Sequence, residues 1–115
     1  MGGPGGATLI MEKFWENNPL RKDRDIILMD QRGTGESEAN CIEMGAAMFD
    51  IMRQDLDAKS EINALKTIFS ECKETMKNDG VDLAGYNSRE NAADFEDLRK
   101  ELGYKKWNLL GASYG

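Results

Sequence analysis

The sequence predicts an α/β fold, in which parallel strands are joined by helices, and two kinds of segment carry that prediction. Two short apolar runs, at 26–29 and 107–110, lack polar alternation, as is typical of strands covered on both faces. Between and before them lie longer segments whose apolar residues recur at helical spacing. Because the two kinds of element alternate, we expect parallel strands with right-handed crossovers.

The elements follow in order from the N-terminus. A glycine-rich opening at 1–6 precedes a helix expected at about 8–17, where apolar residues repeat at i, i+4 spacing. Pro19 ends this helix, because the residue before a proline is pushed out of the helical region. The first strand, at 26–29, runs directly into a polar, glycine-containing loop at 30–37.

Residues 38–86 are expected to form a mainly helical insertion built as a hairpin. One helix is predicted by Met44, Met48, Ile51 and Met52. The second carries an apolar stripe with steps of three and four residues, and Gly80 is placed to end it: Ile62, Leu65, Phe69, Cys72 and Met76. Such stripes are usually packing surfaces, so no chemistry is assigned to them.

The last third predicts one helix and one strand. Asn87 or Ser88 can cap the helix, with Glu90 available to reach back from the first turn. Gly103 ends it, and the strand at 107–110 then leads into the final five residues.

Composition excludes some classes of function. The 115 residues amount to one domain, and their net charge of −6 comes from interleaved acidic and basic residues, which argues against a nucleic-acid partner. No apolar run approaches the roughly 18 residues of a membrane span. No signal peptide is visible, which is uninformative, and the oligomeric state is left open.

The final residues, 111–115, read G-A-S-Y-G and match the G-x-S-x-G pattern of a nucleophile elbow. In that motif a serine sits on a sharp turn after a strand, and small neighbours let the backbone pass close by. Ser113 is therefore the candidate nucleophile. A serine nucleophile needs a base, usually histidine, and the chain contains no histidine. We therefore expect a piece of a serine hydrolase.

Three motifs together, GGPGG, DQRGTGES and LRKELGYKKWNLLGASYG, resemble the proline iminopeptidase and tripeptidyl-aminopeptidase-like family of α/β-hydrolases. The resemblance implies that residues 1–115 are the N-terminal part of an α/β-hydrolase core, ending at the elbow, with 38–86 inserted between two strands. It implies hydrolysis of peptides with a free N-terminus, without metal or organic cofactor. An esterase or another small-molecule hydrolase of the same fold is the alternative. A non-catalytic fragment is the third possibility.

Carried over by position, the resemblance makes Ser113 the nucleophile and gives the Tyr114 backbone N–H to the oxyanion hole. Gly2 and Gly3 are the candidates for the second donor, since glycine lets a backbone N–H approach the oxyanion closely. Many family members have a histidine where this chain has Met1. The family's catalytic aspartate and histidine follow the elbow, so we expect them beyond Gly115 and assign no aspartate here to catalysis.

The loop at 30–37 has two interpretations. A phosphate-binding loop is disfavoured, because the third glycine of G-x-G-x-x-G is missing and no helix opens directly there. The favoured role is architectural, with Asp30, Gln31 and Arg32 satisfying the loop backbone and each other.

Cys41 and Cys72 are either two free thiols or a disulfide. Similar tripeptidyl-aminopeptidase-like proteins carry a cysteine pair in this region, and the resemblance favours the bond. It would close a loop of 31 residues and stabilise it by about 3 to 4 kcal/mol. A disulfide would favour a periplasmic or secreted location, and free thiols a cytoplasmic one.

The resemblance also predicts a gap in the sheet. In the family's sheet order, the strand that precedes the GGPGG loop lies between the two strands expected here, and this sequence does not contain it. The strands at 26–29 and 107–110 should therefore lack a neighbour and expose apolar edges, which would leave the chain poorly stable alone.

Overall fold

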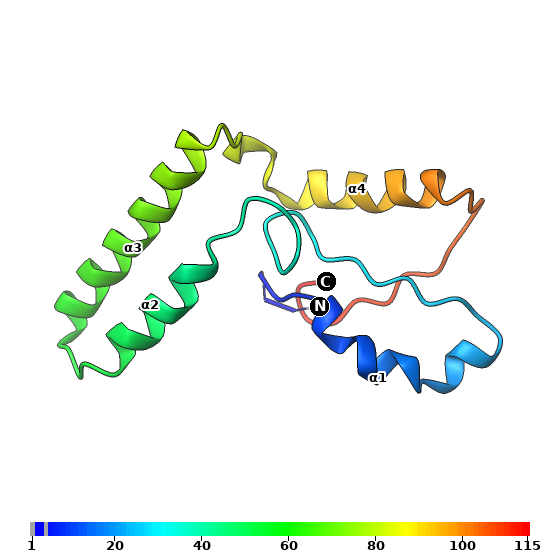
Figure 1. Ribbon diagram of the computed structural model, residues 1–115, viewed down its shortest axis with the longest axis horizontal. Coiled ribbons are helices and arrows are strands. Elements are labelled where there is room, and N and C mark those ends of the chain that lie inside the picture. Colours follow the sequence, from blue (N-terminus) through cyan, green and yellow to red (C-terminus); the bar gives the residue numbers. More distant parts are fainter. Residues whose placement is uncertain (1, 4) are drawn as a thin grey trace. The chain divides into compact units, whose positions relative to one another are not determined.

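The computed structural model of the protein describes residues 2, 3 and 5–115 (Figure 1). The chain forms two compact units. The first, here called the terminal unit, comprises Met1–Glu38 and Gly85–Gly115. The second, the hairpin unit, is Ala39–Ala84.

The hairpin unit consists of helices α2 (Ile42–Met52) and α3 (Ala58–Asn78), which lie side by side (Figure 1). Both predicted helices of this region are therefore confirmed. The Asp57 carboxylate caps α3 by accepting hydrogen bonds from the backbone N–H groups of Lys59 and Ser60. Gly80, with φ +80°, follows the C-cap of α3, as predicted.

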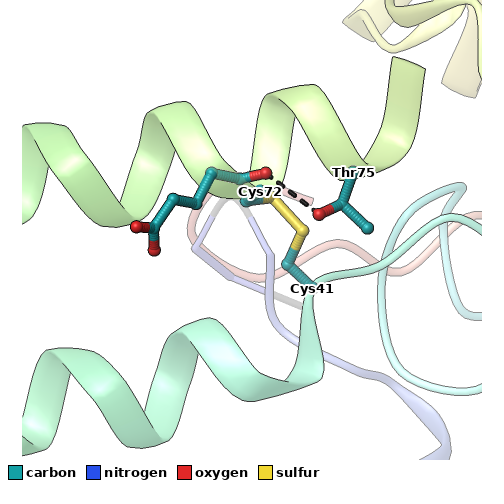
Figure 2. Close-up of a disulfide and its surroundings, with 4 residues drawn as sticks. Cys41, Cys72 and Thr75 are labelled. Atoms are coloured by element: carbon teal, nitrogen blue, oxygen red, sulfur yellow. Dashed lines mark hydrogen bonds between the residues drawn. A yellow bond between two sulfur atoms is a disulfide. The ribbon is translucent and has the colours of Figure 1, made fainter. Parts of the chain in front are cut away.

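A disulfide between Cys41 and Cys72 ties the residue before α2 to the middle of α3 (Figure 2). Their Cα atoms are 6.0 Å apart. One turn further along α3, the Thr75 hydroxyl donates a hydrogen bond to the Glu71 carbonyl (Figure 2). Of the apolar side chains in the described part of the chain, Ile51 of α2 is the one that is buried, with 7% of its surface exposed.

The terminal unit begins with three short helical elements: η1 (Leu9–Met11), α1 (Glu12–Glu16) and η2 (Pro19–Lys22). η1 and α1 cover the helix predicted at about 8–17, and α1 ends at its C-cap Asn17, whereas η2 lies beyond the predicted range. The short η3 (Leu83–Gly85) precedes the longer α4 (Ser88–Glu101) along the chain. Asn87 caps α4 by accepting from the N–H groups of Arg89 and Glu90. Gly103, with φ +76°, follows its C-cap, as predicted.

The predicted parallel strands are not formed. Residues 26–29 and 107–110 run as coil, and among the described residues no strand is present (Figure 1). No backbone hydrogen bond joins these two segments to each other within the described part of the chain. The physical reason is that a strand exists only when its N–H and C=O groups meet those of a neighbouring strand, and the described residues supply no such neighbour.

Apolar side chains of these two segments consequently remain in contact with solvent. Leu109 and Leu110 are 73% and 75% exposed, and Ile27 is 41% exposed. The described residues that are buried in the terminal unit are polar: Asp30 and Thr34. The terminal unit is therefore held by hydrogen bonds and turns rather than by an apolar core.

Candidate nucleophile elbow and oxyanion loop

The segment around Ser113 is a tight turn with a left-handed backbone at the serine. Ser113 has φ +59°, a conformation uncommon for a residue with a side chain. The Gly115 N–H donates a hydrogen bond of 3.1 Å to the Ala112 carbonyl and closes the turn. A β-carbon on Gly111 would overlap the Gly115 carbonyl. The turn is therefore so tight that position 111 accepts only glycine, as a nucleophile elbow requires.

The opening glycines lie directly against this turn. A β-carbon placed on Gly2 would lie 2.7 Å from the Ser113 Cβ and 3.1 Å from its Oγ. Real β-carbons essentially never come within 3.0 Å of another atom in this way, so only glycine permits this approach. The two ends of the sequence, which share no local signal, are brought together at the Ser113 side chain.

The opening segment itself bends sharply. Gly3 and Gly5 have φ +135° and +102°, and the Gly6 N–H donates to the Gly2 carbonyl at 3.2 Å. A β-carbon on Gly3 would lie 2.7 Å from the Gly5 nitrogen. Within the described part of the chain, no hydrogen bond uses the backbone N–H of Gly3. Met1 lies outside the described residues.

The backbone and the side chain of Tyr114 have different surroundings. Its backbone N–H makes no hydrogen bond to another described residue. Its phenol lies 2.7 Å from the Ser88 hydroxyl, at the first residue of α4. The side chain thus ties the elbow to α4.

Asp30 connects the loop at 30–37 with the segment that follows the opening glycines. Its Oδ1 accepts hydrogen bonds from the backbone N–H groups of Thr8 and, at 2.9 Å, Leu9. Its Oδ2 accepts from the Glu36 N–H at 3.0 Å. Only 6% of the Asp30 surface is exposed. A buried carboxylate thus holds three backbone donors from two segments of the terminal unit.

These contacts favour the ionised form of Asp30. Burial alone opposes the charge and would raise the pKa of the carboxyl group. The backbone hydrogen bonds from Leu9, Glu36 and Thr8 act in the opposite direction, and the net pKa of Asp30 is lowered from its ordinary value. Asp30 is therefore a carboxylate at neutral pH.

Arg32 fixes the same loop to α4. Its guanidinium makes two hydrogen bonds to the Asp94 carboxylate, at 2.7 and 2.5 Å, and a third to the Gly85 carbonyl at 2.6 Å. The hydrogen bond to Asp94 raises the pKa of Arg32. Gln31 accepts a longer hydrogen bond, 3.5 Å, from the Asn91 side chain.

The architectural role predicted for the loop at 30–37 thus has a structural basis, but the partners differ from those expected. Asp30 holds the backbone of its own loop, as predicted. Arg32 and Gln31 were expected to bind each other and Asp30, but their side chains bind Asp94 and Asn91 of α4. Sequence reasoning also missed the link from Asp30 to Thr8 and Leu9. No local signal could reveal it, since 21 residues separate Leu9 from Asp30.

The described residues contain no group of three or more acidic, cysteine or histidine side chains that could hold a metal ion. An open apolar groove in the terminal unit runs along 26–30 and α4, with Leu9, Leu98 and Leu102 among its lining. Ser113 is not part of it. No helix in the described part of the chain is both long and apolar enough to span a membrane.

The family model of the alpha/beta hydrolase fold matches residues 2–115. No curated protein sequence and no solved structure matches the chain. The matched range includes the opening glycines, the loop at 30–37 and the elbow, and it supports a hydrolase of this superfamily.

Proposed function

The chain belongs to the alpha/beta hydrolase fold family, and we propose that it supplies the nucleophile and the oxyanion hole of a serine hydrolase that releases N-terminal residues from peptides. Ser113 is the proposed nucleophile. Tyr114 and either Gly2 or Gly3 are the proposed donors of the oxyanion hole. One observation carries the proposal: Gly2 approaches the Ser113 side chain so closely that a β-carbon would lie 3.1 Å from its Oγ.

In the proposed reaction the Ser113 Oγ attacks the substrate carbonyl, and its proton passes to a base. The carbonyl oxygen becomes an oxyanion beside the Tyr114 and opening-loop N–H groups, each worth roughly 3 kcal/mol of transition-state stabilisation. Collapse expels the amine, which takes up the proton from the base, and leaves an acyl-enzyme. Water then releases the acid and restores Ser113.

The base has to come from residues outside these 115, because the sequence contains no histidine. We therefore expect the 115-residue chain alone to be inactive. Hydrolysis of any ester or arylamide by the purified chain, above that of a Ser113→Ala control, would contradict this expectation.

The peptidase assignment rests on the resemblance of the three motifs to the proline iminopeptidase-like family. The competing substrate class is a short acyl ester. Comparing kcat/KM for aminoacyl arylamides and short acyl esters, in the complete reading frame that encodes these residues, separates the two. Turnover of esters alone would replace the peptidase by an esterase and leave the site unchanged.

The role of Ser113 is tested in the same complete protein with a fluorophosphonate probe, which labels an activated serine covalently. We expect labelling of the wild type, its loss in Ser113→Ala, and full labelling in Ser70→Ala, a matched control at an exposed serine of α3 in the hairpin unit. Labelling that survives in Ser113→Ala would overturn the proposal.

We also propose that the protein works in an oxidising compartment, such as the periplasm or the extracellular space. The Cys41–Cys72 disulfide supports this proposal, because structural disulfides are rare in reducing compartments. Alkylation of the protein inside its native cells, before lysis, would show whether these cysteines are paired there.

A further inference from the structure

The Asp30 carboxylate joins two segments that are far apart in the sequence. It holds the N–H groups of Thr8 and Leu9 with one oxygen and the N–H group of Glu36 with the other. The Ser37 hydroxyl additionally donates to the Asp30 carbonyl at 3.0 Å. Both the side chain and the backbone of Asp30 are therefore fixed.

Steric contacts at Gly35 reinforce this junction. Gly35 has φ +54°, and a β-carbon placed on it would overlap the Asp30 Oδ2 and lie 2.9 Å from the Ala7 Cβ. The loop therefore packs directly against the Ala7 side chain, just before Thr8. Nothing larger than glycine is compatible with the observed contact.

One hydrogen bond and one close contact between described residues link the Asp30 junction to the proposed nucleophile Ser113. Ala7 follows Gly6, whose N–H is hydrogen-bonded to the Gly2 carbonyl, and Gly2 lies against Ser113. The opening loop is thus a short, tightly bent segment that is anchored by Asp30 at one end and faces the serine at the other.

We propose that Asp30 is the positioning residue of the oxyanion hole: by holding Thr8 and Leu9 it fixes the opening glycines at the distance from Ser113 that an oxyanion needs. The inference rests on the proposed function of Ser113 and deepens it. Asp30 does not touch the reacting atoms and acts through the backbone of the opening loop.

A carboxylate is suited to this task because it is an acceptor at both oxygens. Three N–H donors converge on Asp30, and hydrogen bonds to a charged acceptor are about twice as strong as neutral ones. An asparagine at the same place would keep one oxygen for two of the donors and turn an NH2 group toward the third. Asp30→Asn should therefore be partly functional, and Asp30→Ala should be worse.

The test compares Asp30→Ala and Asp30→Asn with the wild type in the complete protein, using whichever of the aminoacyl arylamides and short acyl esters the wild type hydrolyses faster. We expect kcat to fall about 10- to 100-fold in Asp30→Ala, since small displacements of catalytic groups cost up to about that much. KM should stay within about threefold, because substrate binding does not use the oxyanion donors. Asp30→Asn should recover part of the loss.

Asp94→Ala is the matched control. Asp94 is also a carboxylate bound to the loop at 30–37, through Arg32, but it makes no contact with the opening loop in the described structure. It should lower stability and leave kcat within about twofold. Equal kcat losses in the Asp30 and Asp94 variants would show a general loss of folding and overturn the inference.

Amide hydrogen exchange of the same variants gives a readout that does not need activity. Asp30→Ala, which removes both acceptor oxygens, should accelerate exchange at Thr8, Leu9 and Glu36, and Asp94→Ala should not. If exchange at Thr8 and Leu9 is unchanged in Asp30→Ala, the positioning role is wrong even when Ser113 is active. If the wild type neither labels nor hydrolyses, the proposed function fails and the oxyanion role of Asp30 fails with it.

Discussion

The sequence predicts the secondary structure of the hairpin unit better than that of the terminal unit. In the hairpin unit, both predicted helices form, with the predicted Gly80 after the second one. In the terminal unit, the helix α4 forms where predicted, but both predicted strands are absent from the described residues. The difference teaches that an element forms from its own sequence when its backbone hydrogen bonds are internal to it, as in a helix. A strand depends on residues elsewhere.

The chain offers one probe that is specific to the terminal unit. Both of its tryptophans, Trp15 and Trp107, belong to that unit, so tryptophan fluorescence reports on it alone. Far-UV circular dichroism at 222 nm reports on the helices of both units, of which α3 in the hairpin unit is the longest. The following predictions use this contrast, in order of decreasing expected effect.

The largest effect is expected from the disulfide. Replacing both cysteines, in Cys41→Ser/Cys72→Ser, should lower the free energy of unfolding of the hairpin unit by about 3 to 4 kcal/mol, because the bond closes a loop of 31 residues. The loss should appear in the denaturation curve followed at 222 nm and much less in tryptophan fluorescence. An unchanged midpoint at 222 nm after reduction would contradict a stabilising role.

The second-largest effect is expected from a substitution in the turn around Ser113. Gly111→Ala puts a β-carbon into the Gly115 backbone, so the turn must open and Ser113 must move. In the complete protein we expect fluorophosphonate labelling to slow by about 100-fold or more, as for a reacting group displaced by about 1 Å. Labelling at the wild-type rate would mean that the observed turn is not the reactive conformation.

Lowering the pH should reduce the contribution of Asp30 to the stability of the terminal unit. Because the pKa of Asp30 is lowered in the folded state, its contribution to stability is present above the ordinary carboxyl pKa near 4 and is lost as the pH falls through the lowered value. The stability difference between wild type and Asp30→Asn should thus be largest near neutral pH and shrink below about pH 4. Denaturation followed by tryptophan fluorescence at several pH values measures it. A difference that grows on acidification would contradict this sign.

The smallest expected effect is an increase in the stability of the hairpin unit. Gly45 lies within α2, and a β-carbon there would meet nothing within 4 Å. Gly45→Ala should therefore stabilise the hairpin unit by about 0.5 to 1 kcal/mol through its higher helix propensity. It also serves as the control for Gly111→Ala, since both exchange a glycine for alanine. A loss of stability at 222 nm would show that α2 packs against something at this position.

In the candidate site, too, contacts between neighbouring residues could be predicted from the sequence, whereas contacts between distant segments could not. The motif at 111–115 led to Ser113 and to the requirement for glycine at 111, because the turn is made by neighbouring residues. The opening glycines were assigned to the same site by resemblance, and the structure places Gly2 against Ser113. The partners of Asp30 and Arg32 could not be predicted, since they come from segments 21 and 62 residues away.

Local sequence was sufficient for the helices, their caps and the turn around Ser113, because each depends on contacts within about four residues along the chain. Tertiary structure alone decided that Gly2 meets the serine, that Asp30 anchors the opening loop and that Arg32 pairs with Asp94. Within the described part of the chain, residues 26–29 and 107–110 have no partner strand, which is a tertiary outcome that the resemblance predicts. The physical reason is common to all four: a contact between distant segments exists only once the chain has brought both partners into place.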